Sequence, residues 1–232
     1  MATTSAQRSP LFYARLAGIL YLVLFVCGPY SMLYIPASIV VPGDATATAN
    51  NLMASGWQFK LGIVGDVAIF TTEVVMSVIF YVLLKPVSQS LALIAAFFRL
   101  MQAGVQGANL LNHLTALLLV SGNEYLTAFQ PAQTHALVLL TFESHRYGVL
   151  IGQLFFAVHL LFLGTLVYRS TCFPSILGIG LVAAGIGYLI ECFTLFLAPA
   201  YEMLTYPGLT VAALAEMAFM LWLLIKGVRA RA

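Results

Sequence analysis

Residues 99–113 read RLMQAGVQGANLLNH, a stretch that is apolar except for an arginine, two glutamines, two asparagines and a histidine. Its polar positions are spaced three or four residues apart, at Arg99, Gln102, Gln106, Asn109 and His113. Side chains at this spacing lie on one face of an α-helix, so the pattern predicts a helix with a single polar stripe. A charged side chain that faces lipid is costly. We therefore expect the stripe to face other helices or water.

The composition of the whole chain indicates a membrane protein. Of its 232 residues, 62% are hydrophobic and 8% are charged, whereas soluble domains carry about 25% charged residues. The mean hydropathy is +0.99. The net charge is +2 and the basic residues form no long run, so we expect no nucleic-acid partner. Three cysteines do not make a disulfide framework and are expected as free thiols. We expect a single integral membrane domain over residues 1–232.

Six apolar stretches are long enough to cross the hydrocarbon layer, which takes about 20 helical residues. Backbone groups in lipid must be paired within the segment, so each stretch is predicted to be a helix. The sequence therefore predicts an all-α membrane protein with a bundle of six transmembrane helices. The expected spans are about 13–35, 58–84, 90–119, 147–168, 174–197 and 204–225.

Proline and aspartate positions predict breaks and shorter helices. We expect a kink at Gly28–Pro29 and the end of the first span near Pro36. Two short helices are expected at the outer interface, near 45–54 and 131–142. Asp44 would cap the first of them, and the second is too short to cross alone.

Orientation follows from the positive charges, which favour the cytoplasmic side. With six spans, most basic residues fall on one side: Arg8, Arg15, Lys85, Arg169, Lys226, Arg229 and Arg231. The acidic loop residues fall on the other side: Asp44, Glu124, Glu143 and Glu202. We therefore expect both termini in the cytoplasm and the protein in the cell membrane.

The second and third spans are joined by a tight turn around Pro86 and are predicted to form an antiparallel hairpin. Residues equally far from the turn would then lie at equal depth. Glu73 and Arg99 are each 13 residues from Pro86, and Asp66 and Gln106 are each 20 residues from it. The same reflection matches Lys60 with Asn112. The hairpin therefore predicts a buried pair of opposite charges near mid-bilayer.

Distances from the span ends assign further polar residues to three predicted depths. His159 and Glu216 each lie ten residues from a basic residue at the inner end of their span, or about 15 Å from that interface. The central layer would contain Glu73, Arg99, His159 and Glu216. A second layer would contain Asp66, Gln106, Gln153 and Glu191. A third, outermost layer would contain Lys60, Asn112, His113, His145 and Arg146.

Two interpretations of these layers stay open. In one, Glu73 and Arg99 form a structural clasp, because a buried charge pair is tolerated when it is hydrogen-bonded. In the other, the layers line a site for a solute or proton. Arg99 would then bind an anionic group or keep Glu73 charged, and Glu216 or His159 would titrate. His113 and His145 are weak candidates for metal or haem ligands, against an ordinary interfacial role.

Four longer stretches resemble a known family. They are YARLAGILYLVLFVCGPYSMLYIPASIVVPGDATATANNLMAS (13–55), KPVSQSLALIAAFFRLMQAGVQGANLLN (85–112), FFAVHLLFLGTLVYRSTCFPSILG (155–178) and GYLIECFTLFLAP (187–199). Together they resemble the bacterial multi-pass membrane family known as domain of unknown function 4386, over nearly the whole chain. The resemblance implies about six membrane helices in the inner membrane of a bacterium, and it supplies no activity. It also implies family-like motifs around Asp44, Arg99, Asn109, Asn112, His145 and His159.

The leading functional hypothesis is a small-molecule or ion transporter, or a related solute-binding protein. Its candidate ligand-binding or proton-coupling residues are Asp66, Glu73, Arg99, Gln102, Gln106, Asn109, His159 and Glu216. One alternative is a membrane enzyme that depends on a metal or haem held by His113, His145 and His159. Another is a structural or sensor subunit whose polar layers only fix helix packing. We predict no cofactor, and we expect the lipid bilayer and a small molecule or ion as partners.

Overall fold

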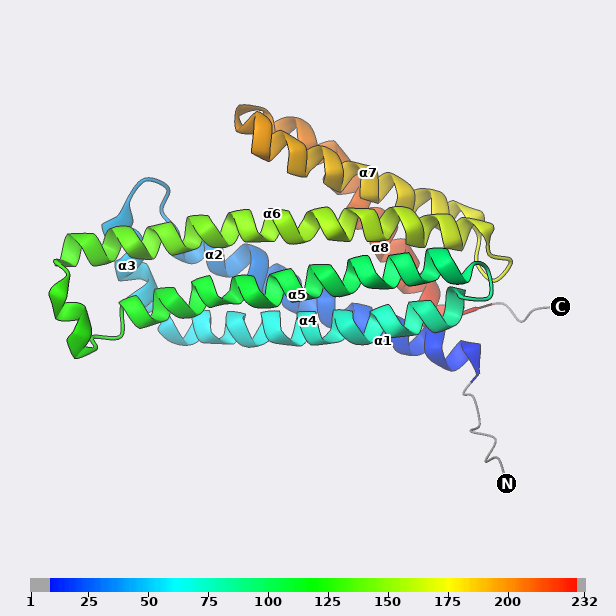
Figure 1. Ribbon diagram of the computed structural model, residues 1–232, viewed down its shortest axis with the longest axis horizontal. Helices are drawn as coiled ribbons and strands as arrows, with labels where there is room; N and C mark the ends of the chain where they lie inside the picture. The colour runs from blue at the N-terminus through cyan, green and yellow to red at the C-terminus, as the bar shows by residue number, and fades with distance from the viewer. Residues whose placement is uncertain (1–8, 229–232) are drawn as a thin grey trace, which may run out of the picture. The chain divides into compact units, whose positions relative to one another are not determined.

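The computed structural model describes residues 9–228, and every regular element in that range is helical. Six helical segments there are long and apolar enough to cross a membrane, which confirms the predicted all-α fold with six spans (Figure 1). Three of the basic residues used for orientation, Arg8, Arg229 and Arg231, lie outside the described residues. The six segments are Pro10–Ile39, α4 (Gly56–Leu84), α5 (Gln89–Leu119), α6 (Pro131–Arg169), α7 (Ser175–Leu197) and Pro199–Ile225.

The first and last spans are built from several helical pieces. The first consists of α1 (Pro10–Gly28), the π-helix η1 (Pro29–Tyr34) and α2 (Ile35–Ile39). The last consists of the 3₁₀ helix η3 (Pro199–Thr205) and α8 (Tyr206–Ile225).

The irregularity predicted at Gly28–Pro29 is present as the π-helix η1. Pro29 has no N–H to donate to the preceding turn, and the extra residue in a π turn accommodates that loss. The predicted end of the first span at Pro36 is wrong, because the helix continues to Ile39. Pro36 is the second residue of α2, which follows η1 without leaving the helical backbone conformation.

Of the two predicted short helices, one forms as expected and one does not. Helix α3 (Ala45–Ala54) is capped by Asp44, whose Oδ1 accepts from the Ala47 N–H at 2.9 Å. The segment 131–142 is not a separate helix, because α6 runs unbroken through 39 residues. No proline follows Pro131 in this stretch to interrupt the ladder. At about 1.5 Å per residue, α6 is about 58 Å long, roughly twice the hydrocarbon thickness.

The described chain divides into two compact units. Unit 1 takes residues 9–22, 74–100 and 153–228, and unit 2 takes Val23–Glu73 and Met101–Gly152. Helices α1, α4, α5 and α6 therefore each contribute one segment to unit 1 and one to unit 2. The prediction of one integral domain over the whole chain stays a prediction.

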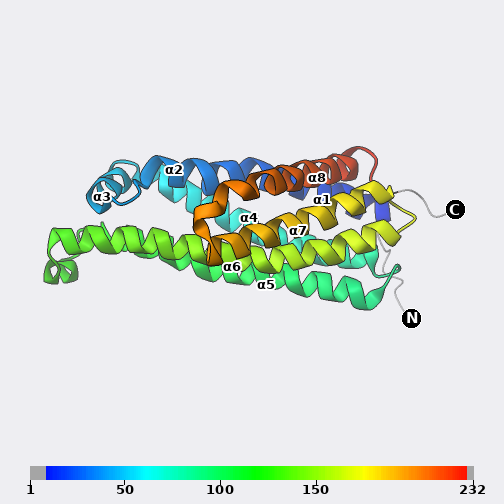
Figure 2. The same cartoon turned by 90° about the horizontal axis from the view of Figure 1, so that it is seen from above.

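In unit 1, glycines bring neighbouring helices into backbone contact. A Cβ added at Gly164 of α6 would lie 2.7 Å from the Gly178 carbonyl oxygen of α7. One added at Gly187 of α7 would lie 2.9 Å from the Gly208 carbonyl oxygen of α8. Small residues permit such close approach between membrane helices. Figure 2 shows α7 and α8 running side by side in consequence.

The four described basic residues at span ends all belong to unit 1. Arg15 lies in the second turn of α1, while Lys85, Arg169 and Lys226 lie at the ends of α4, α6 and α8. These helix ends gather at one end of the unit, at the right in Figure 1. The clustering agrees with the charge asymmetry used for orientation, and the cytoplasmic assignment of that end stays a prediction.

In unit 2, an aliphatic and aromatic core joins five helices. Residues from α2, α3, α4, α5 and α6 form it: Ile35, Ile39, Ala49, Leu52, Phe59, Ala116, Val138 and Phe142. Helix α3 is tied to this core by Asn51, whose Nδ2 donates to the Ile39 carbonyl at 3.2 Å. The core lies next to the polar residues at the outer end of the α5 stripe, because Phe59 and Phe142 both contact His113.

We expect Gly164→Ala to lower the thermal unfolding temperature of the purified protein in detergent. The added methyl group would meet the backbone of α7, which no side-chain rotation relieves, and such overpacking costs about 1–3 kcal/mol. The matched control is Gly104→Ala, because nothing lies within 4 Å of a Cβ at Gly104. That control should unfold at the same temperature or higher. Equal stability of the two variants would contradict the close α6–α7 packing.

Candidate functional site

The polar stripe of α5 is buried along its whole length, as its spacing predicts. Arg99, at the start of the stripe, is 2% exposed, whereas Met101 and Leu111 on the opposite face are 51% and 63% exposed. The buried stripe consists of Arg99, Gln102, Gln106, Asn109 and His113. The other predicted site residues, Asp66, Glu73, His159 and Glu216, are buried too. The apolar face of α5 is therefore the one left for lipid.

In unit 2, the last residue of the stripe, His113, stacks against a second histidine. The rings of His113 and His145 of α6 are nearly parallel, with centroids 3.5 Å apart and planes inclined by 20°. His113 Nδ1 lies 3.9 Å from Asp66 Oδ2 of α4. The rings of Phe59 and Phe142 lie 5.0 and 5.6 Å from that of His113. Three helices thus place two imidazoles and one carboxylate in a mostly apolar setting.

Asn109 fixes the position of His145 through the backbone. Its Nδ2 donates to the His145 carbonyl at 2.9 Å, and His145 Nδ1 donates to the Asn109 carbonyl at 3.3 Å. Asn112 Nδ2 in turn donates to Asn109 Oδ1 at 2.9 Å. A Cβ at Gly148 would lie 2.0 Å from that same oxygen. Gly148, one turn after His145, therefore leaves room for the Asn109 amide.

The two glutamines of the stripe donate through their amide groups. Gln102 Nε2 donates to Glu73 Oε1 at 2.9 Å, which brings together two of the predicted site residues. Gln106 Nε2 donates to the Val149 carbonyl at 3.4 Å, beside Gly152. Because only the NH₂ group of an amide can donate, both glutamine oxygens must point elsewhere.

Four buried polar atoms of this region have no hydrogen-bond partner among residues 9–228. They are Asp66 Oδ1, Gln102 Oε1, Gln106 Oε1 and His113 Nε2. Three of the four atoms are oxygens. The two amide oxygens can only accept hydrogen bonds, and the carboxylate oxygen can only accept when Asp66 is ionised. Buried polar groups in native proteins are nearly always satisfied by protein, water or ligand. The unpartnered acceptors are therefore positions where a water molecule or a ligand can donate a hydrogen bond.

In unit 1, a second polar cluster surrounds Phe156 of α6. The Arg99 guanidinium lies over the Phe156 ring at 4.5 Å from its centroid, and the His159 ring stacks near the same residue at 6.1 Å. Tyr188 of α7 contacts Phe156 at 5.4 Å, and its hydroxyl donates to Glu216 Oε1 of α8 at 2.8 Å. Phe156 and Tyr188 thus connect three predicted central residues, and sequence spacing alone did not reveal either.

His159 has a defined tautomer when neutral. Its Nδ1 lies 2.8 Å from the Ala95 carbonyl of α5, so this nitrogen must carry the proton. The other ring nitrogen, Nε2, is then an acceptor, and within the described chain it is buried without a hydrogen-bond partner. The neutral ring is therefore available to accept one proton or one donor.

The predicted pairings are met in part. Gln153 Nε2 donates to Glu191 Oε2, as expected from their placement in the same predicted layer. His113 and His145, which were also predicted to share a layer, are in contact. The match of Asp66 with Gln106 is wrong, because Asp66 faces His113 and Gln106 donates to α6. The match of Lys60 with Asn112 is also wrong: Lys60 is exposed, and Asn112 donates to Asn109. Glu73 and Arg99 belong to different units, and their pairing stays a prediction.

Reflection about the turn leaves out the direction in which side chains lean. Side chains lean toward the N-terminus of their own helix. On α4 this direction leads away from the turn at Pro86, and on α5 it leads back toward the turn. An α4 residue therefore meets an α5 residue that is further from the turn than its mirror image. Glu73 is 13 residues from Pro86 and Gln102, which donates to it, is 16 residues from it. For Asp66 and His113 the separations are 20 and 27, a difference in the same direction but larger than this lean alone gives.

The histidine pair does not have the geometry of a metal or haem site. Imidazole lone pairs lie in the ring plane, so two stacked rings direct them along parallel lines rather than at one ion. Across residues 9–228, no group of three or more histidine, cysteine, aspartate or glutamate side chains is placed to hold a metal ion. The predicted free thiols are present as Cys27, Cys172 and Cys192.

We expect Gly148→Ala to destabilise the wild-type protein by displacing the Asn109 amide, since a lost buried hydrogen bond costs about 1–3 kcal/mol. Asn109→Ala should cost a similar amount. In the Asn109→Ala background, however, Gly148→Ala should add little, because the clashing atoms are gone. Unfolding temperatures of the four proteins in detergent give this double-mutant cycle. Additive losses would show that Gly148 and Asn109 act independently.

Comparison with known proteins places the chain among its relatives. The family described as domain of unknown function (DUF4386) matches residues 16–227. A protein of Archaeoglobus fulgidus, described as "Uncharacterized protein", is 33% identical over 168 residues, which cover 71% of this chain and 83% of that one. No solved structure matches. The six spans and the extent of the match agree with the resemblance read from the sequence, and the chain is a multi-pass membrane protein that belongs to the DUF4386 family.

Proposed function

We propose that this protein binds and transports a small cation or another solute rich in hydrogen-bond donors. The binding residues would be Asp66, Gln102, Gln106 and His113 of unit 2. One observation carries the proposal: three buried oxygens in this group have no partner among the described residues. We place the protein in the cell membrane, with both termini in the cytoplasm.

The chemistry of the vacant atoms selects the ligand. Each unsatisfied buried acceptor costs about 1–3 kcal/mol, and a carboxylate without a lysine or arginine partner inside a membrane protein is costlier still. A ligand that donates hydrogen bonds removes the first cost, and a positive charge removes the second. Asp66 would supply the charge at the His113 end of the stripe, and the Gln106 and Gln102 oxygens, further along α5, would accept hydrogen bonds at other positions along the solute's path. Ammonium, alkylammonium and guanidinium ions have this combination of charge and donors.

Proton coupling follows from the same carboxylate. A proton on Asp66 neutralises it and turns one oxygen into a donor, so proton and cation would compete for one site. His113 Nδ1, 3.9 Å from Asp66 Oδ2, would exchange that proton. In unit 1, His159 and Glu216 would be further proton carriers, because His159 Nε2 is an acceptor without a partner in the described chain and Glu216 Oε1 accepts from the Tyr188 hydroxyl. Exchange of a cation for a proton is the transport mode that this competition supports.

Two other hypotheses give the polar residues different roles. An anionic solute would use Arg99, whose guanidinium lies on the Phe156 ring. A purely structural role would need the polar atoms only for packing, as for Asn109. The metal or haem enzyme finds little support, since the His113 and His145 rings are stacked.

The cation proposal can be tested by ligand-dependent stability. Purified protein in detergent is unfolded thermally with ammonium, methylammonium or guanidinium chloride, each against sodium chloride of equal ionic strength at concentrations too low to denature. At 100 times its dissociation constant a ligand adds about 2.7 kcal/mol, so we expect at least one cation to raise the unfolding temperature. Asp66→Asn should abolish the rise. Asp44→Asn is the matched control, because Asp44 only caps α3 and asparagine caps equally well.

Transport itself is tested in vesicles that enclose a pH-sensitive dye. An inward gradient of the binding cation should move protons outward through the wild type and Asp44→Asn, and not through Asp66→Asn. A cation response that survives in Asp66→Asn would refute the proposed site. Stabilisation by organic anions alone, lost in Arg99→Gln, would favour the anionic alternative. No response to any cation, with no proton movement, would favour the structural role.

A further inference from the structure

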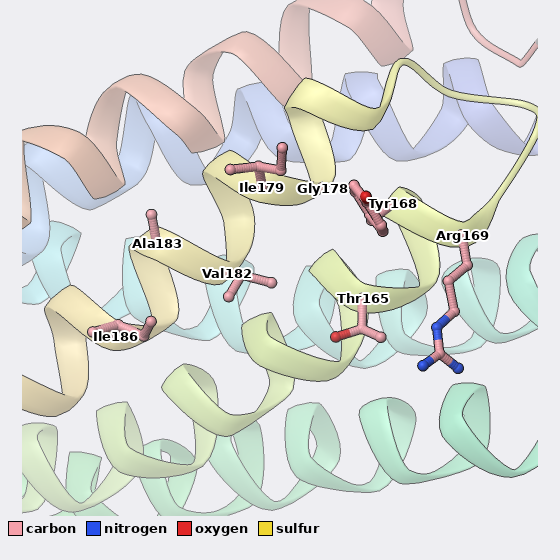
Figure 3. Close-up of a pocket in the computed structure, with 8 residues that line it drawn as sticks. All are labelled: Thr165, Tyr168, Arg169, Gly178, Ile179, Val182, Ala183 and Ile186. Atoms are coloured by element: carbon pink, nitrogen blue, oxygen red, sulfur yellow. The ribbon is translucent and has the colours of Figure 1, made fainter.

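A groove lies between α6 and α7 of unit 1, and none of the residues of the polar clusters lines it. Its volume is about 500 Å³. Figure 3 shows residues of α6 on one side and of α7 on the other. Thr165, Tyr168 and Arg169 come from the last turns of α6, and Ile179, Val182 and Ile186 come from α7. The groove is therefore largely apolar along its length, with one basic residue at the end of α6.

The close glycine contact between the two helices explains the groove. A Cβ at Gly178 would lie 2.4 Å from the Tyr168 backbone nitrogen, so the helix backbones touch and no side chain fills the space above them. The flanking side chains remain accessible, with Ile179 at 52% and Ile186 at 48% exposed. From Ile179 to Ile186 the apolar wall rises about 10 Å along α7.

Arg169 gives the groove a charged end. It is the last residue of α6 and is exposed. Among residues 9–228, its side chain forms no hydrogen bond or ion pair. Exposed Tyr168 lies beside it, in the position that aromatic residues favour at a membrane interface. An unpaired guanidinium at a span end attracts anions, and it binds phosphate with two parallel hydrogen bonds.

We propose that this groove is a binding site for an anionic phospholipid. Arg169 holds the phosphate, and an acyl chain lies between α6 and α7 against Ile179, Val182 and Ile186. The apolar wall matches a lipid tail, and the guanidinium matches its headgroup in sign and geometry. One basic residue at a span end raises the affinity for an anionic lipid about fivefold. The site is independent of the proposed cation transport.

Native mass spectrometry of the protein with phosphatidylglycerol or phosphatidylcholine tests the proposal. We expect the wild type to retain phosphatidylglycerol about fivefold more strongly than phosphatidylcholine, and Arg169→Gln to lose that preference. Lys226→Gln is the matched control, because Lys226 is an exposed cation at the same end of unit 1 and does not line the groove. Ala183→Trp, which fills the groove and keeps Arg169, should lower retention of both lipids.

The other outcomes overturn the proposal. Equal losses in Arg169→Gln and Lys226→Gln would show a diffuse attraction to positive charge. Unchanged retention in a folded Ala183→Trp variant would exclude the groove. Arg169→Gln is an exposed substitution that leaves the helix contact intact, so it decides the question should Ala183→Trp fail to fold. Competition by inorganic phosphate as strong as that by phosphatidylglycerol would identify a site for free phosphate.

Discussion

The scarcity of hydrogen-bond partners in lipid constrains this structure more than any other factor. Helix α5 carries polar side chains over four turns, and each needs a partner from a neighbouring helix. In unit 2, α4 supplies carboxylates to Gln102 and His113, while α6 supplies backbone carbonyls to Gln106 and Asn109. The polar stripe thereby determines which face of α5 turns inward and which two helices lie against it.

Glycines on α6 make these backbone contacts possible. Gly148 and Gly152 are four residues apart, so they share one face of α6. The amides of Asn109 and Gln106 occupy the space that a side chain at either glycine position would need. Each amide donates to a carbonyl that already belongs to the α6 ladder and uses its second lone pair. A helix can therefore satisfy the polar groups of its neighbour without polar side chains of its own.

This arrangement explains what the sequence could and could not predict. Periodicity identified the buried face of α5, and length with hydropathy identified the six spans, because both depend on local spacing alone. The partners of Asp66 and Gln106 could not be found by reflection about Pro86. Side chains lean along their helices, and Gln106 binds a backbone group that has no sequence signature. The continuity of α6 past residue 142 was missed because length alone suggested a separate interfacial helix.

The polar residues of the α4–α5 region differ in how many of their side-chain polar atoms form hydrogen bonds. Both side-chain polar atoms of Asn109 are engaged, so that residue behaves as a structural clasp. Gln102 and Gln106 each use only their amide nitrogen, and Asp66 keeps one oxygen without a partner in the described chain. A sequence selected for packing alone has no reason to keep buried acceptors vacant, since each costs stability. At these three residues the unpartnered oxygens support the proposed binding site over a purely structural role.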